Sequence, residues 1–270
     1  MKDNYDAAFK AVIGTPQREI EEEFISVAEM QRKILPEPKI VRRYRDFRIF
    51  GGTLPIEWVG GDFYDFIELQ GFNIEERLGV VIADVSGHGL SAAMLVRDFN
   101  TALYTGIAFE AHYAKDTTPL LFEKLNRRMF RSSLANQFIT AFYAELHPDG
   151  KLRYINAGHL APLVFHRDEV VRLQVGGPVL GAFDTPPVPY QVGEVMIKNG
   201  DLLVAYSDGI VEAVDGDEQE YGVSRLEKQV LRMQRRPVRE IFEAVLDDVD
   251  SFTGHARQSD DRTLIIVRKG

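Results

Sequence analysis

The sequence contains no cysteine among its 270 residues. This excludes a disulfide framework, a thiolate zinc site, an iron–sulfur cluster and a cysteine nucleophile. Long apolar runs are absent too, because segments such as 78–83 and 202–206 are far shorter than the roughly 20 residues that cross a bilayer. No secretory hydrophobic region follows Met1, so we expect a cytoplasmic protein with no membrane partner.

Basic residues are in the minority. The chain has 32 lysines and arginines against 41 aspartates and glutamates, which gives a formal net charge of −9. Because nucleic-acid binders carry a basic surface, this balance argues against a nucleic-acid partner. Hydrophobic residues make up 45% and charged residues 27% of the chain, a composition typical of a globular protein with enough apolar material for a large core.

The first predicted element is a helix over residues 16–35. Thr15 can cap it, and Pro16 suits the first helical position, where the N–H that proline lacks would have no partner. Its stripe at heptad-like spacing consists of Ile20, Phe24, Val27, Gln31 and Ile34. The stripe fits either a surface helix packed on the body or a short coiled coil that pairs two chains. We therefore divide the chain into an N-terminal segment with a linker helix, residues 1–38, and one domain, residues 39–270.

Strand patterns and helix patterns follow in blocks. Strands are predicted at 47–54, 63–69, 78–85, 138–146, 152–156, 163–166, 170–173, 202–206 and 263–268, and helices at 91–105, 119–132, 223–233 and 237–252. The stretch 176–189 holds three glycines and four prolines, which predicts a structured loop. Because the helices come in two blocks between runs of strands, we expect an α+β architecture. Helices should cover mostly antiparallel sheets in which sequential strands pair.

Four aspartates lie beside apolar strands, in tight turns of small residues. They are Asp62, Asp84, Asp208 and Asp260. Carboxylates gathered at strand ends repel one another, and a divalent cation offsets that repulsion. A ligand set of oxygens alone favours Mg²⁺ or Mn²⁺ over zinc. Taken singly, Asp208 fits a plain turn better than a metal site, and Asp260 fits a loop between a helix and a strand as well as a metal site. Asp84, between an apolar run and two glycines, is the most unusual, because a carboxylate on a buried strand needs a partner. The shared strand-end context of all four is what favours a metal site.

A competing interpretation concerns residues 87–92. Their sequence, GHGLSA, matches the dinucleotide fingerprint G-x-G-x-x-A between a strand and a helix, and Glu110 follows about twenty residues later. Against it, Asp84 stands just before the glycines and would repel a pyrophosphate. His88 and His159 lie in glycine-containing loops, where a neutral histidine more often makes a structural hydrogen bond than ligates an ion.

Six motifs occur in order over most of the chain. They are GGDFYDF at 60–66, DVSGHG at 84–89 running into SAAML at 91–95, NAGH at 156–159, GGPVLG at 176–181, YSDG at 206–209 and DDRT at 260–263. Together they resemble the SpoIIE/RsbU-type bacterial branch of the metal-dependent protein phosphatases, the relatives of protein phosphatase 2C. The resemblance covers about residues 20–270. It fits the absence of cysteine, which excludes the cysteine-dependent phosphatases.

The resemblance implies a four-layer α-β-β-α sandwich of two antiparallel sheets flanked by helices, with two Mn²⁺ or Mg²⁺ ions at one edge. The residues that match the family's catalytic metal ligands are Asp62, Asp84, Asp208 and Asp260, with the backbone carbonyl of Val85 as a further ligand. Asp261 ranks behind Asp260. In this family the ions activate a bridging water, which attacks a phosphoserine or phosphothreonine in line without a phosphoenzyme intermediate.

The resemblance also implies partners. The family's substrate is often a phosphorylated anti-sigma-factor antagonist of the STAS type, which places the expected activity in bacterial stress or developmental signalling. The helix at 16–35 resembles the family's linker, which joins an upstream sensor or regulator to the phosphatase domain. This linker commonly pairs two chains, which implies a homodimer. The 176–181 loop resembles a switch region. A catalytically silent or regulator-dependent scaffold of the same fold is the alternative, although such a scaffold usually lacks an acidic ligand.

Overall fold

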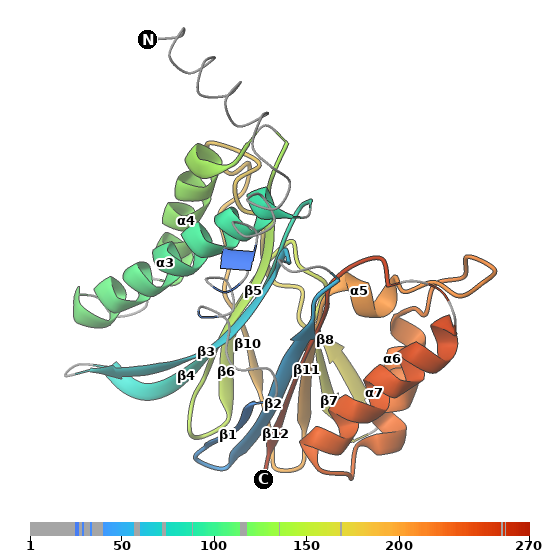
Figure 1. The fold of residues 1–270 in the computed structure, drawn as a ribbon. Coiled ribbons are helices and arrows are strands. Elements are labelled where there is room, and N and C mark those ends of the chain that lie inside the picture. Colours follow the sequence, from blue (N-terminus) through green and yellow to red (C-terminus); the bar gives the residue numbers. More distant parts are fainter. Residues whose placement is uncertain are drawn as a thin grey trace, which may run out of the picture.

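The computed structural model has two β-sheets packed face to face, with helices on the outer side of each (Figure 1). The structure describes residues 40–56, 60–71, 74–87, 89–113, 118–134, 136–167, 169–254, 256 and 258–270, with 25, 26, 29 and 33. The predicted helix at 16–35 and the boundary at residue 38 lie outside the described residues, apart from those four single positions. Both stay predictions.

The first sheet has the strand order β1-β2-β12-β11-β7-β8. Its strands are β1 (Ile40–Tyr44), β2 (Phe47–Leu54), β7 (Leu163–His166), β8 (Glu169–Arg172), β11 (Leu202–Tyr206) and β12 (Arg262–Lys269). The last strand, β12, lies in the middle, antiparallel to both β2 and β11. The two ends of the domain therefore meet in the centre of this sheet.

The second sheet has the order β10-β6-β5-β4-β3, and a short strand, β9, pairs in parallel with β6. Its strands are β3 (Asp62–Gly71), β4 (Ile74–Val85), β5 (Ile139–Leu146), β6 (Lys151–Ala157), β9 (Gly176–Gly177) and β10 (Gly193–Met196). Here the predicted pairing of sequential strands is confirmed from β3 to β6, and every pair along the main path is antiparallel.

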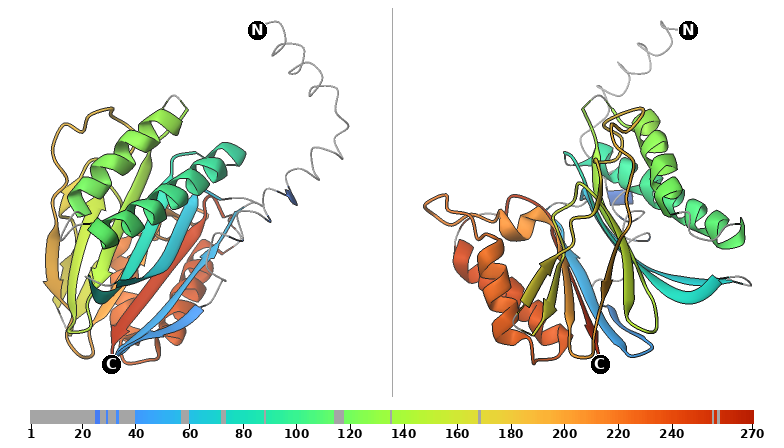
Figure 2. Two further views of the ribbon diagram at one scale, coloured as in Figure 1. Left: turned by 90° about the vertical axis from the view of Figure 1, so that its left-hand side faces the viewer. Right: turned by 180° about the vertical axis from the view of Figure 1, so that it is seen from behind.

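The helices form the two outer layers (Figure 2). Helices α3 (Leu90–Tyr113) and α4 (Thr118–Ser132) cover the second sheet. Helices α6 (Val223–Met233) and α7 (Val238–Thr253) cover the first sheet, where the single-turn helix α5 (Asp208–Val211) follows β11. None of the helices in the described part of the chain is both long enough and apolar enough to span a bilayer.

Three apolar clusters hold these four layers together. On β3, Phe63 packs toward the helices α3 and α4, whereas Tyr64 and Phe66 pack between the two sheets. This alternation follows from the period of two along a strand that is buried on both faces. Each fully buried aromatic or aliphatic side chain contributes about 1.5–3 kcal/mol. The third cluster joins the first sheet to α6 and α7. The predicted four-layer α+β sandwich is thus confirmed.

Some predicted elements differ from the observed ones. Helix α3 continues to Tyr113 instead of ending near residue 105, because Ile107 extends its buried stripe. Strands β1 and β10 and helix α5 were not predicted. The prediction that sequential strands pair is wrong for β2 and β3. These two strands lie in different sheets, because β2 pairs with β1 and β12.

Candidate metal centre

Two of the predicted aspartates face each other across neighbouring strands. Asp62 opens β3, Asp84 lies next to the end of β4, and the two are direct antiparallel partners. Side chains at such positions have Cβ atoms about 4.5–5.5 Å apart, where like charges repel. Asp62 lies two and four residues before Tyr64 and Phe66, and alternate residues of a strand share one face. Asp62 therefore lies on the face that meets the other sheet.

The first sheet brings the other two aspartates to the same edge. Asp208 starts α5 after β11, and Asp260 precedes β12, the neighbour of β11. One cavity of about 450 Å³ is lined by Asp84, Asp208 and Asp260 together with Val85. Asp62 does not line this cavity. The structure therefore brings three of the four predicted aspartates together and places the fourth behind them.

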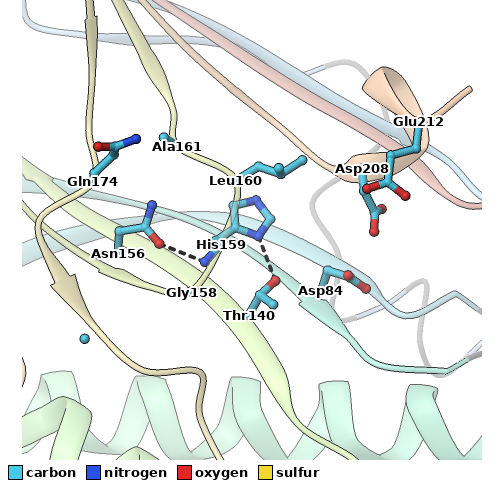
Figure 3. A pocket seen from close by; sticks show the side chains of 11 residues that line it. Asp84, Thr140, Asn156, Gly158, His159, Leu160, Ala161, Gln174, Asp208 and Glu212 are labelled. Atoms are coloured by element: carbon cyan, nitrogen blue, oxygen red, sulfur yellow. Dashed lines mark hydrogen bonds between the residues drawn. The ribbon is translucent and has the colours of Figure 1, made fainter. Parts of the chain in front are cut away.

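A second cavity, of about 460 Å³, adjoins the first and shares Asp84, Thr140 and Asp208 with it. Figure 3 shows these two carboxylates with Glu212 on one side and His159 on the other. Glu212 was not predicted as part of the site. It lies four residues, about one helical turn, after Asp208, so the spacing would have revealed it had α5 been predicted.

Burial and mutual repulsion perturb the carboxylates that line the cavities. Burial, followed by the charges of Asp208 and Asp260, raises the pKa of Asp84 to about 7. Burial, followed by Asp260 and Glu212, raises the pKa of Asp208 to about 6. Each pKa reports the unfavourable free energy of bringing anions together in a poorly solvated place. A divalent cation would reverse the sign of that interaction.

Asp62 lies deeper than the other three. Its side chain is fully buried, and burial together with Asp84 raises its pKa well above the usual range. Two hydroxyl groups oppose this shift: Thr263 Oγ1 donates to Asp62 Oδ2 at 2.5 Å, and Ser207 donates a second hydrogen bond. Both donors belong to the first sheet or its edge, so this aspartate of the second sheet is held across the sandwich.

The neighbouring Asp261 has a different environment from Asp260. Its Oδ1 accepts a hydrogen bond from the Ile56 N–H at 2.8 Å, and its Oδ2 accepts one from the Asp62 N–H at 3.3 Å. A Cβ on Gly60 would lie 2.0 Å from Asp261 Oδ2, so only glycine fits there. The carboxylate of Asp261 therefore organises the turn before β3. This agrees with ranking it behind Asp260 as a ligand.

The backbone near Val85 is also tightly packed. The Val85 N–H donates to the Gly61 carbonyl at 3.1 Å, and a Cβ on Gly61 would lie 2.9 Å from the Val85 carbonyl oxygen. The glycine thus allows the two strand ends to approach closely. Val85 lines the 450 Å³ cavity beside Asp84, which is the position expected for a backbone ligand.

His159 makes structural contacts behind Asp84. Its Nδ1 lies 2.9 Å from Thr140 Oγ1, and its backbone N–H donates to Asn156 Oδ1 at 2.8 Å (Figure 3). Thr140 is the direct strand partner of Asp84. Burial lowers the pKa of His159 to about 4, so the ring is neutral near pH 7. The expectation of a structural hydrogen bonder is confirmed for His159, while His88 lies outside the described residues.

The loop after β8 packs between α4 and the second cavity. Gly177 lines that cavity, and the Gly181 N–H donates to Asn126 Oδ1 on α4 at 2.9 Å. The Asn126 side chain in turn donates to the Phe183 carbonyl at 2.8 Å. The loop therefore connects α4 to the site. A switching role for it stays a prediction.

The donor set fits a hard divalent cation. Among the described residues, no three histidine, aspartate or glutamate side chains lie close enough together to share one ion as they stand. Asp84, Asp208 and Asp260 nevertheless line one cavity with oxygen donors alone, the chemistry that Mg²⁺ and Mn²⁺ prefer. Binding an ion there requires these carboxylates to close around it. The dinucleotide interpretation is wrong, because β4, which precedes segment 87–92, lies between antiparallel neighbours.

Solved structures share this fold. The SiaA-PP2C domain of Pseudomonas aeruginosa has a TM-score of 0.76 at 21% identity, and the match covers 93% of this chain and 98% of that one. RsbX in complex with magnesium has a TM-score of 0.61 at 15% identity, with 86% of this chain and 100% of that one covered. The two sheets and the carboxylate edge thus define a PP2C-type phosphatase fold.

Sequence comparison identifies the family. The family model described as Stage II sporulation protein E (SpoIIE) matches residues 74–270, so the chain belongs to this family and is a protein phosphatase. The phosphoserine phosphatase RsbU of Bacillus subtilis (strain 168) is 26% identical over 259 residues, which cover 94% of this chain and 72% of that protein. The resemblance inferred from the six motifs is confirmed.

Proposed function

We propose that this chain is a metal-dependent phosphatase of phosphoserine and phosphothreonine in proteins. The observation that carries the proposal is the cavity in which Asp84 from one sheet meets Asp208 and Asp260 from the other. Similarity to the phosphoserine phosphatase RsbU supports the substrate class. The oxygen donors and the magnesium complex of RsbX support the use of Mg²⁺ or Mn²⁺.

Asp84, Asp208 and Asp260 would hold the ions, with Asp62 and the carbonyl of Val85 completing the set for two of them. When bound, the ions lower the pKa of coordinated water and so supply hydroxide at neutral pH. The chain's own residues prepare this site. Thr263 and Ser207 stabilise the ionised form of the buried Asp62 by donating hydrogen bonds to it. The packing of His159 and Thr140 orients the strand end that carries Asp84.

The proposed substrate is a serine-phosphorylated antagonist of an anti-sigma factor, with a STAS-type fold. Removal of the phosphate then changes which partner the antagonist binds, and hence transcription in bacterial stress or developmental signalling. An upstream sensor or regulator acts through the N-terminal segment, which also pairs two chains. These statements rest on membership of the SpoIIE family and on the sequence of residues 16–35.

The proposal is tested by hydrolysis of p-nitrophenyl phosphate and of a phosphoserine peptide, with Mn²⁺, with Mg²⁺ and with a chelator. We expect metal-dependent turnover that falls at least about a hundredfold in Asp208→Asn, because removal of one ligand charge weakens ion binding. Asp247→Asn, an exposed position on α7 away from both cavities, is the matched control. Equal activity of wild type and Asp208→Asn would exclude the assigned site.

A further inference from the structure

Exposed apolar side chains gather beside the candidate metal centre. Met94 near the start of α3 is 65% exposed, Phe130 near the end of α4 is 42% exposed, and Leu134 and Phe138 in the loop before β5 are 64% and 36% exposed. We call these four residues the docking face. Single exposed apolar residues are ordinary, but a group of them on one surface marks an interaction site.

The docking face is continuous with the metal cavity. Phe138 lines the 450 Å³ cavity that holds the three aspartates, and it also lines a hollow of about 470 Å³ with Phe130 and Leu134. Leu134 in turn shares a further hollow, of about 310 Å³, with Met94. A protein that places a phosphorylated side chain in the cavity therefore also contacts these neighbouring apolar residues.

Hydrogen bonds fix the docking face relative to the carboxylates. The Phe138 N–H donates to Ser86 Oγ at 2.9 Å, and the Ser86 N–H donates to the Phe138 carbonyl at 3.0 Å. Gln137 Nε2 donates to Ser91 Oγ on α3 at 3.3 Å, and its Oε1 accepts from the Leu134 N–H at 3.1 Å. Because Ser86 follows Asp84 by two residues, a partner seated on the face is held at a set position from the site.

Positive charge borders the docking face. Arg127 and Arg131 lie one helical turn apart on the exposed side of α4, and Arg131 directly follows Phe130. Neither has an ion pair with any residue that the structure describes. In a chain with a net charge of −9, two unpaired arginines beside an apolar surface favour a partner with acidic groups.

We propose that the docking face binds a folded, serine-phosphorylated protein substrate. The substrate presents an apolar patch next to its phosphoserine and acidic side chains toward Arg127 and Arg131. This inference rests on the proposed phosphatase function and adds to it a determinant of substrate choice outside the metal centre. A small phosphate ester in the cavity does not reach Met94 or Leu134, which do not line it, so the two kinds of substrate respond differently to changes at those two residues.

The test uses three substrates and three variants of the full chain. The substrates are a serine-phosphorylated STAS-domain protein, a phosphoserine peptide of about ten residues from around its phosphorylation site, and p-nitrophenyl phosphate. Met94→Glu and Leu134→Glu alter the docking face, while Met196→Glu alters an equally apolar, 46% exposed residue on β10. For the protein substrate, we expect each docking-face variant to lower kcat/KM about tenfold, through KM.

The controls separate docking from other effects. We expect Met196→Glu to match wild type on every substrate, and we expect the Met94 and Leu134 variants to keep wild-type turnover of the peptide and of p-nitrophenyl phosphate. Unchanged turnover of the phosphorylated protein would overturn the proposal. Equal losses on all three substrates would overturn it as well, since the metal centre itself would then be affected. Light scattering that shows altered mass with unchanged kinetics would assign the face to a second copy.

A binding measurement separates failure of docking from failure of the phosphatase proposal. The Asp208→Asn variant and the double variant Asp208→Asn/Leu134→Glu are titrated with the phosphorylated STAS-domain protein by calorimetry. We expect about tenfold weaker binding by the double variant. Equal affinities would overturn the docking face even if turnover were absent throughout, whereas absent turnover with this tenfold difference would contradict only the phosphatase proposal.

Discussion

At the residue scale, the candidate site is a place where like charges are held together. Asp84 and Asp208 share a cavity, where the charge of Asp208 helps to raise the pKa of Asp84, while Asp62 is buried behind them and held by hydroxyl groups. Such an arrangement destabilises the metal-free fold near neutral pH, because ionising each carboxylate adds repulsion. A bound cation that neutralises these carboxylates would therefore stabilise the fold at this pH.

The first prediction concerns stability against pH without metal. Asp84 has a folded pKa of about 7 and Asp208 of about 6, both above the ordinary 3.8. When a carboxyl group has a higher pKa in the folded state than in the unfolded state, its contribution to stability is complete below the pKa of the unfolded state. That contribution is lost as the pH rises through the pKa of the folded state. We expect the Tm in chelator to fall by a few degrees from about pH 5 to about pH 8, and to fall less in Asp84→Asn.

Differential scanning calorimetry checks this prediction, with Mn²⁺ as the second condition. We expect Mn²⁺ to raise the Tm more at about pH 8 than at about pH 5, since only ionised carboxylates ligate the ion. A metal-free Tm that changes with pH equally in wild type and in Asp84→Asn would contradict the assignment of the loss to this residue.

A second prediction separates the adjacent aspartates. Asp261→Ala removes the acceptor of the Ile56 and Asp62 N–H groups, so we expect the free energy of unfolding in chelator to fall by about 2 kcal/mol. Asp260→Ala removes the acceptor of one N–H, that of Asp261, but also a repulsive charge, so we expect a smaller loss of stability in chelator and a weaker affinity for Mn²⁺. Urea denaturation and metal titration measure the two effects. An equal loss of stability in both variants would refute the distinction.

The sequence identified the candidate site residues but did not predict how deeply each of them is buried. The strand-end context and the six motifs pointed to all four aspartates, and three of them line one cavity. The depth of Asp62 could not be predicted, because it depends on hydroxyls of Ser207 and Thr263 that approach from the opposite sheet. Glu212 was missed for a local reason, since the single turn that carries it is too short to show a periodic pattern.

At the element scale, segments with an apolar pattern were predicted well, whereas the charged edge strands β1 and β10 were not. Strands β2, β7 and β11 and helix α6 have the predicted bounds, because their apolar patterns continue over their whole lengths. Strands β1 and β10 lie at the edges of their sheets and carry charged residues such as Arg43 and Glu194, so no apolar run marks them. Edge strands commonly carry such charges.

A prediction at this scale concerns the packing of α5 against the start of β12. A Cβ on Gly209 would lie 2.0 Å from the Asp261 carbonyl oxygen, so Gly209→Ala must push α5 and Asp208 away from the start of β12. We expect a lower Tm, by several degrees, and loss of most metal-dependent turnover. Gly216→Ala is the matched control, because nothing lies within 4 Å of the added methyl group. Thermal unfolding and p-nitrophenyl phosphate assays that show equal behaviour of the two variants would contradict this account.

At the scale of the whole molecule, the candidate site exists only where the two sheets meet. One sheet supplies Asp62 and Asp84, and the ends of β11 and β12 supply Asp208 and Asp260. Local patterns could not place β2 and β3 in different sheets, since both are apolar and consecutive. The resemblance to a known family implied two packed antiparallel sheets but did not assign these two strands to them.

The last prediction concerns the oligomeric state. The stripe at Ile20, Phe24, Val27 and Ile34 fits a surface helix and a short coiled coil alike, and we propose the coiled coil, which pairs two chains. We expect light scattering to give a dimer mass for the full chain and a monomer mass for a chain that lacks residues 1–35. Identical monomer masses for both would remove the proposed dimer, while leaving the metal centre unaffected.

The central place of β12 bears on how the protein is made. Residues 262–269 come last among the strands along the sequence, yet they pair with both β2 and β11 and begin two residues after Asp260. During synthesis, β2 and β11 emerge before the strand that separates them, so these two strands cannot be joined in one sheet until residues 262–269 have been made. A chain truncated before Asp260 therefore lacks both the central strand of the first sheet and one carboxylate of the cavity.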